Sequence, residues 1–159
     1  MAFGLVPIVH IVAAVFAIIE LGLTAYIASG YNTWWGWGAG SPRVNFMIFN
    51  SVWSLLVLAY VGLTPLYLTS LFHRLAALVL NALTTVFWFA GAVALAVAVG
   101  GPWHCGPDSY CGSSEAAVAF GFFLWVLFTV LTVIDALDSL RSRGHNVGAH
   151  SKPAAYPGA

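Results

Sequence analysis

Residues 75–99 read LAALVLNALTTVFWFAGAVALAVAV, a run of 25 positions without a charged side chain. The hydrocarbon core of a bilayer is ~30 Å thick, and a helix needs about 20 mostly apolar residues to cross it. The alternation AVALAVAV at residues 92–99 is typical of a strand in isolation, but here it ends a long apolar run. Because lipid cannot hydrogen-bond open backbone groups, the whole run predicts a membrane-spanning helix.

The composition of the whole chain agrees with this reading. The 159 residues are 61% hydrophobic and 6% charged, whereas soluble domains are about 25% charged. This small number of charged groups cannot cover a surface that faces water. The chain is therefore predicted to be surrounded by lipid. The net charge is zero, which removes the electrostatic basis for binding nucleic acid.

Three further apolar runs are long enough to cross a bilayer. The four predicted helices cover about residues 5–28, 46–66, 75–99 and 116–137. The first run has no basic start and is too long for the core of a signal peptide, so we expect it to stay as a helix. The fold class is therefore all-α, a four-transmembrane-helix bundle forming one domain over residues 1–138. Residues 139–159, rich in Ser, Gly and Pro, predict a disordered tail.

The connectors and the basic residues predict an orientation. Glycines and a proline in residues 30–43 predict a non-helical loop, and residues 67–74 form a tight turn. Four spans place both termini on the side of that turn, together with four of the five basic residues; only Arg43 lies on the other side. Basic residues favour the cytoplasm, so the termini are predicted to be cytoplasmic and residues 100–115 to face outward.

The chain has two cysteines, Cys105 and Cys111, both in this outward loop. Disulfides form and persist on the non-cytoplasmic side of a membrane, and Gly106 and Pro107 let the intervening chain fold back far enough for a bridge. A structural disulfide is predicted, with two free thiols as the alternative. A redox-active pair is disfavoured because the Cys-x-x-Cys spacing is absent.

Glu20 lies deep in the first span, where a charge costs at least ~2.5 kcal/mol. It can serve a function there, by binding a cation, relaying protons or recognising a polar lipid group. The alternative is a protonated carboxyl that faces the bundle interior and is hydrogen-bonded to Asn50, Ser51 or Ser54 of the second span. We favour the alternative because a transport path normally presents several such groups.

Other polar side chains in the spans have structural interpretations. His10 is predicted to be a buried imidazole bonded to a backbone carbonyl, and Asn81 to hydrogen-bond between helices. Asp135 and Asp138 are predicted to form a charge cluster with nearby arginines at the membrane interface. The five histidines are scattered, and neither a metal-ligand spacing nor a catalytic motif is present. The sequence therefore predicts no metal, no cofactor and no enzyme.

Small residues recur at four-residue spacing in two spans: Ala90, Ala94 and Ala98 in the third, and Ala117 and Gly121 in the fourth. Small side chains let helices approach closely in lipid. Packing inside the bundle is one explanation. A second small face lies beside the first on the third span, however, so a further contact with another copy or another membrane protein is predicted.

Tryptophans gather in or beside the outward loops, at Trp34, Trp35, Trp37 and Trp103. Amphipathic rings prefer the headgroup level. These residues are predicted to anchor the loops in the membrane interface, and a cradle for a lipid or sterol is the alternative.

Three stretches resemble a known family: HIVAAVFAIIELGLTAYI at residues 10–27, ALTTVFWFAGAVALA at residues 82–96 and AAVAFGFFLWVLFTV at residues 116–130. They are similar to the MARVEL domain in the form common in fungal membrane proteins, and the resemblance covers about residues 5–137. It implies an M-shaped tetraspan protein of sterol-rich microdomains that self-associates and has no transferable active site. Cys105 and Cys111 match the paired loop cysteines of that family.

The function predicted is that of a non-enzymatic tetraspan protein that organises membrane microdomains or trafficking. It would act by lateral association with itself, with lipids, including sterols, or with partner proteins. Plasma membrane or endomembrane vesicles are the predicted location. The alternatives are an ion or small-solute channel or transporter that uses Glu20, and an accessory subunit of a larger membrane complex.

Overall fold

The computed structural model describes residues 4–34, 41–67, 74–100 and 109–149. These residues form four helices and no strand, which confirms the all-α prediction. The helices are α1 (Leu5–Trp34), α2 (Pro42–Tyr67), α3 (Arg74–Val99) and α4 (Ser109–Ala149). Each contains a segment long and apolar enough to cross a membrane: Val6–Gly30, Pro42–Gly62, Leu75–Val99 and Ser109–Arg141.

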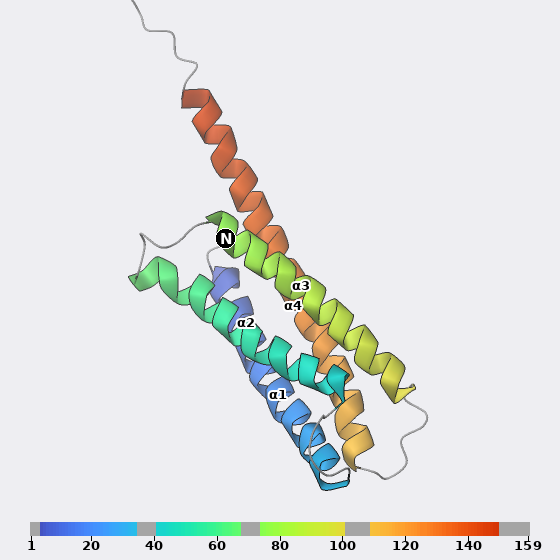
Figure 1. Cartoon of the computed structure of the whole chain (residues 1–159). Coiled ribbons are helices and arrows are strands. Elements are labelled where there is room, and N and C mark those ends of the chain that lie inside the picture. The colour runs from blue at the N-terminus through green and yellow to red at the C-terminus, as the bar shows by residue number, and fades with distance from the viewer. Residues whose placement is uncertain (1–3, 35–40, 68–73, 101–108, 150–159) are drawn as a thin grey trace, which may run out of the picture.

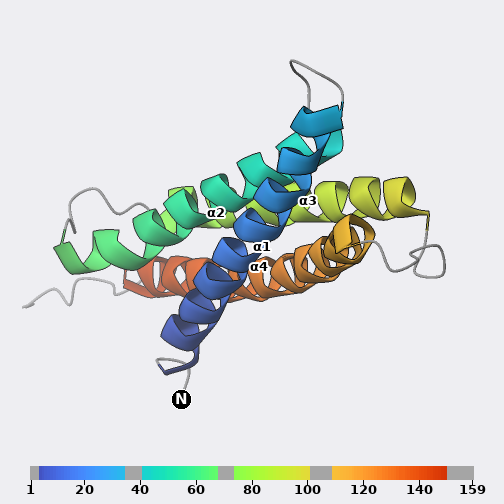
Figure 2. The same ribbon diagram turned by 90° about the horizontal axis from the view of Figure 1, so that it is seen from below.

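The four helices form a bundle in which each one packs against its neighbours in the chain (Figure 1). α1 packs on α2, α2 on α3 and α3 on α4, and α4 returns to α1, which closes the ring. Seen from below, α1 crosses the other helices obliquely (Figure 2). The start of α1 and the end of α4 lie at the same end of the bundle (Figure 1). We call the opposite end, where α1 ends and α4 begins, the distal end.

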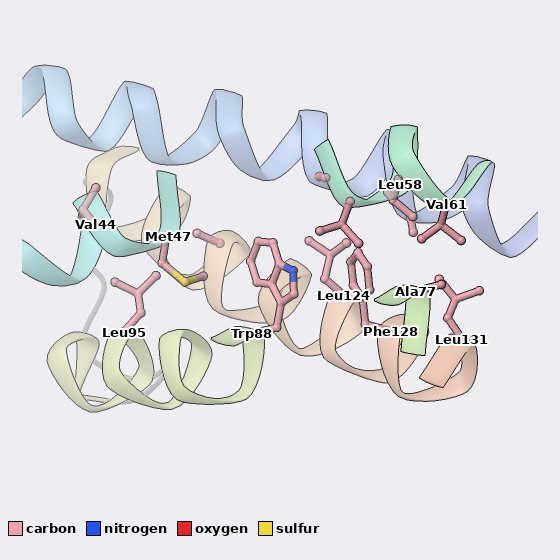
Figure 3. Packing of buried hydrophobic residues seen from close by; sticks show 14 of the residues in the cluster. Val44, Met47, Leu58, Val61, Ala77, Trp88, Leu95, Leu124, Phe128 and Leu131 are labelled. Carbon is pink, nitrogen blue, oxygen red and sulfur yellow. The ribbon is translucent and has the colours of Figure 1, made fainter. Parts of the chain in front are cut away.

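A column of buried side chains runs along the bundle (Figure 3). It begins with Val44 and Leu95 near the distal end, passes Trp88 and Phe128, and reaches Leu131 at the other end. Large apolar side chains also cover the outside of the bundle. Lipid is as apolar as this core, so shape and hydrogen bonding, rather than hydrophobicity, decide which helix faces meet.

Two glycines allow the close approach that this packing needs. A Cβ built on Gly91 of α3 would lie 2.7 Å from Met47 Sδ and 2.9 Å from Asn50 Nδ2. A Cβ on Gly121 of α4 would lie 3.0 Å from Met47 Cε and 3.2 Å from Ala92 Cβ. α2, α3 and α4 therefore meet around Met47, where side chains larger than glycine do not fit without displacement.

The prediction of a non-helical loop over residues 30–43 is wrong at both ends of that range. α1 continues through Gly30 to Trp34, and α2 already begins at Pro42. Proline suits the first helical position because its missing N–H would have no partner there, and the Asn45 N–H donates to the Ser41 carbonyl at 3.1 Å. Gly30 does not break its helix: a Cβ there would lie 2.6 Å from the Tyr110 ring, so the glycine makes room for α4.

α4 is longer than predicted at both ends, whereas α3 matches its predicted limits to within one residue. The first turn of α4 includes Cys111. At its other end, residues 139–149 are helical where the sequence predicted a disordered tail. An existing helix adds residues at low cost, and a single internal glycine such as Gly144 opposes this by only ~1 kcal/mol. α4 consequently extends past the other helices (Figure 1).

Replacing Gly91 with Leu is expected to lower the free energy of unfolding by about 1–3 kcal/mol, because overpacking displaces neighbouring side chains. Gly22→Leu is the matched control, since a Cβ at Gly22 meets nothing within 4 Å. Thermal unfolding of both variants in detergent measures the difference. Equal melting temperatures would contradict the proposed role of Gly91.

Candidate functional site

Glu20 is the most unusual side chain of the interior. It lies at the middle of α1 and is 0% exposed. Neither of its carboxyl oxygens has a hydrogen-bond partner among the described residues. The nearby Thr24 hydroxyl donates to the Glu20 backbone carbonyl at 2.7 Å rather than to the carboxyl. Glu20 thus faces the interior, as one of the two interpretations requires, but without the hydrogen bond that this interpretation expected.

The three expected partners of this carboxyl are engaged elsewhere. Asn50 Nδ2 donates to the Phe87 carbonyl of α3 at 3.0 Å. Ser51 Oγ donates at 2.9 Å to the carbonyl one turn earlier in its own helix. Ser54 Oγ accepts a hydrogen bond from Trp88 Nε1 at 2.8 Å. The described hydrogen bonds of these three side chains therefore serve the contact with α3 and the backbone of α2, and not the glutamate.

Two tryptophans that the sequence analysis did not single out join α2 to α3. Trp88 of α3 donates to Ser54 of α2, and Trp53 of α2 donates through Nε1 to Thr84 Oγ1 of α3 at 3.0 Å. A buried indole N–H needs an acceptor. Tryptophans deep inside predicted spans, with Ser or Thr at similar depth, were the available signal for this pair.

A second polar cluster joins α3 to α4, nearer the chain termini. Asn81 Nδ2 donates to Asp135 Oδ2 at 2.7 Å, and the hydroxyls of Thr85 and Thr132 lie 3.2 Å apart. Asn81 thus makes the interhelical contact that the sequence suggested. The described hydrogen-bond partner of Asp135 is this amide on α3, and the charge cluster of Asp135 and Asp138 with nearby arginines stays a prediction.

His10 of α1 lies close enough to Asp135 to interact with it electrostatically. Its Nδ1 lies 2.9 Å from the Val6 carbonyl, the kind of backbone contact that the sequence suggested. Its Nε2 is buried without a hydrogen-bond partner among the described residues. His10 therefore makes no hydrogen bond to Asn81 or Asp135 among the described residues. In the part of the chain that the structure describes, no three His, Cys, Asp or Glu side chains are placed to hold a metal.

The small residues divide into an inner and an outer set. Ala117 is 0% exposed and Gly121 is buried, so the pair on α4 serves packing within the bundle. On α3, Ala90 and Ala98 are exposed and Ala94 is half-buried. Ala90 and Ala98 thus form the exposed part of a small-residue face on α3, and Ala98 also lines a cavity at the distal end of the bundle.

Aromatic rings fill the grooves between neighbouring helices. Phe16 of α1 meets Phe120 of α4 edge to face, with ring centroids 5.2 Å apart. Phe46 of α2 meets Phe87 of α3 at 6.1 Å, and further rings continue both contacts. Of the predicted interfacial tryptophans, Trp34 is the last residue of α1, whereas Trp35, Trp37 and Trp103 lie outside the described residues.

A cavity of about 410 Å³ lies at the distal end, between the ends of all four helices. Cys111 contributes to its wall and is not a free thiol. Cys105 lies outside the described residues, so its pairing with Cys111 stays a prediction. Tyr110, another wall residue, stacks on Tyr26 with ring centroids 4.9 Å apart and an angle of 8° between the planes.

A ring of four apolar helices with an interhelical polar interior defines a tetraspan integral membrane protein. Comparison with known proteins then gives its family: MARVEL, described as a membrane-associating domain, matches residues 3–134, and the chain belongs to this family. The resemblance to this family and the four-span fold that it implies are confirmed.

One similar protein is the non-classical export protein 2 homolog 1 of Saccharomyces cerevisiae. It is 31% identical over 153 residues, which cover 86% of this chain and 82% of the yeast protein. No solved structure matches the chain.

Substitutions at Asn81 and Glu20 are expected to differ in their effect on stability. Asn81→Leu leaves the Asp135 carboxyl without its partner and should lower the free energy of unfolding by about 1–2 kcal/mol. Glu20→Gln breaks no described side-chain hydrogen bond and keeps the volume, so it should leave stability unchanged within about 0.5 kcal/mol. Melting temperatures in detergent test both variants, and a large loss for Glu20→Gln would reveal a missing partner of this carboxyl.

Proposed function

We propose that the protein is a non-enzymatic organiser of membranes that acts by lateral association with further copies of itself. The observation that carries this proposal is the outward small-residue face of α3, formed by Ala90, Ala94 and Ala98. α3 already contacts its neighbours in the bundle through another face, which contains the buried Gly91 and Ala92. The outward alanines are therefore available for a second contact.

In a lipid bilayer, a face of small residues favours the association of helices. There is no hydrophobic drive for helices to associate in a bilayer, so close backbone approach and dispersion decide affinity. Ala90 and Ala98 allow a second helix to approach α3 more closely than neighbouring exposed side chains such as Val86 and Val97 would alone. Lipids, including sterols, and other membrane proteins are the further partners that we propose for this surface.

The similarity to a yeast protein named for non-classical export supports a role in trafficking or export. The interior polar groups support a role without catalysis, since the described hydrogen bonds of Asn50, Asn81, Trp53 and Trp88 all join one helix to another. Plasma membrane or endomembrane vesicles remain our proposed location. We also propose that both chain termini are cytoplasmic.

One observation favours a second candidate function. Glu20 is fully buried and its carboxyl has no described partner, and intramembrane carboxyls of this kind occur in ion and proton paths. Ion flux into proteoliposomes that carry the wild type or Glu20→Gln separates the two functions. An organiser shows no flux with either chain, whereas a channel or transporter shows flux that the substitution changes sharply.

Ala90→Phe is expected to weaken self-association at least about tenfold, because the bulky ring prevents close helix approach. Ala119→Phe is the control, since Ala119 is also an exposed alanine but lies on α4. Energy transfer between labelled copies in bilayers measures the equilibrium. Equal association of both variants would contradict the proposed contact.

Mass analysis of chains that co-purify with the wild type tests the remaining alternative, an accessory subunit.

The proposed orientation predicts which positions an impermeant thiol reagent reaches in intact cells. In a chain carrying Cys105→Ser and Cys111→Ser, Lys152→Cys should be labelled only after the membrane is permeabilised. Gly38→Cys, in the connector between the first two spans, should be labelled without permeabilisation. Labelling of position 152 in intact cells would reverse the orientation.

A further inference from the structure

The distal cavity has the size and chemistry of a ligand site. Its volume of about 410 Å³ lies within the range of small-molecule pockets. Its deep wall includes Ile27 of α1, Val44 of α2 and Leu95 of α3, each at most 4% exposed. Figure 3 shows Val44 and Leu95 at the same end of the core. The side chains of the described residues leave this space unfilled, whereas protein interiors are otherwise close-packed.

The position of the cavity indicates where its occupant comes from. Its lining residues belong to the last turns of the spans in α1 and α3 and to the first turns of those in α2 and α4. The ends of spanning helices lie near the headgroup level of a bilayer. An apolar cavity favours an apolar guest over water, and at this depth the molecules within reach are lipids.

The described lining excludes a charged headgroup. None of the described lining residues is charged, and phosphate groups are normally bound by Arg or Lys. Arg43 precedes the lining residue Val44 but is exposed and does not line the cavity. A phospholipid headgroup would therefore lose its hydration without gaining a cationic partner.

Ser114 indicates the headgroup that fits. Its hydroxyl donates to the Tyr110 carbonyl at 2.8 Å, which uses its hydrogen and leaves the oxygen as an acceptor. A hydroxyl group on the ligand can donate to that oxygen, whereas a carboxylate or phosphate cannot. The Tyr110 ring, held against Tyr26 and Gly30, gives this part of the wall a fixed shape.

We propose that the distal cavity binds one neutral lipid with a hydroxyl headgroup, whose hydroxyl donates to Ser114 and whose apolar body lies against Ile27, Val44 and Leu95. Monoacylglycerols and sterols are two examples of membrane lipids that carry this chemistry on different apolar bodies. Ala98 belongs both to the α3 face proposed for self-association and to the wall of this cavity, whereas Ala90 does not line the cavity, so the Ala90→Phe test of self-association is separate from this site.

Photocrosslinking of the full-length protein in phosphatidylcholine nanodiscs tests the proposal. The probes are photoactivatable analogues of a monoacylglycerol, of a sterol and of phosphatidylcholine. At least one hydroxyl lipid is expected to label residues 27–30 or 110–114, and an excess of the same unlabelled lipid should remove that label. The phosphatidylcholine probe should label only other surfaces. Comparison of the two hydroxyl probes shows which lipid body fits.

Two neighbouring serines provide the matched variants. Ser113 and Ser114 both donate to the carbonyl four residues earlier, but only Ser114 lines the cavity. Ser114→Leu removes the acceptor and fills space, and should reduce hydroxyl-lipid labelling about tenfold, whereas Ser113→Leu should keep it within about twofold. Ser114→Ala adds no bulk and should reduce labelling about threefold, so it serves if Ser114→Leu does not fold.

Equal labelling of folded Ser114 and Ser113 variants, or labelling of the same residues by phosphatidylcholine, would overturn the site. Energy transfer between labelled copies is measured on the same samples. Ser114→Leu is expected to leave self-association unchanged, so failure of the lipid site and failure of the proposed function give different results.

Discussion

The structure depends on the fact that lipid supplies neither hydrogen bonds nor a hydrophobic drive for helix association. Each spanning segment must satisfy its own backbone, so helices are required. What holds the helices together is then close packing and a few interhelical hydrogen bonds. Both are seen here: Gly91 and Gly121 admit Met47 between three helices, and Asn50, Trp53, Asn81 and Trp88 each donate a hydrogen bond across to a neighbouring helix.

α3 has a central place in this arrangement. It packs on both α2 and α4 and supplies or receives each of those four hydrogen bonds. Its inner face carries Trp88, Gly91 and Ala92, and its outer face presents exposed alanines to lipid. The helix that organises the bundle internally is thus the one that we propose to organise its contacts in the membrane.

Most of the described interior is close-packed and hydrogen-bonded, but two places are not. These two places are the candidates for a function. Glu20 is buried without a described partner in the middle of α1. The distal end leaves a cavity between the ends of the four helices. An unpaired buried carboxyl and an unfilled cavity both reduce stability, so a bundle selected for stability alone would have lost them. In the cluster of Asn81, Asp135 and His10, by contrast, an interhelical hydrogen bond engages the carboxyl, although Asn81 Oδ1 and His10 Nε2 have no described partner.

The sequence by itself determined the solvent, the number of spans and the family, because these depend on the lengths of charge-free runs and on composition. The limits of α3 were predictable to within one residue for the same reason, and Asn81 was recognisable as an interhelical contact because an amide in lipid needs a partner. Only the tertiary structure decided which alanines face inward, that Asn50, Ser51 and Ser54 turn away from Glu20, and that Gly30 and Pro42 belong to helices. The physical reason is that a bilayer and a protein core are equally apolar. Hydropathy therefore shows that a helix is surrounded by apolar groups, but the choice between a neighbouring helix and lipid is made by shape and by hydrogen bonds between residues far apart in the chain.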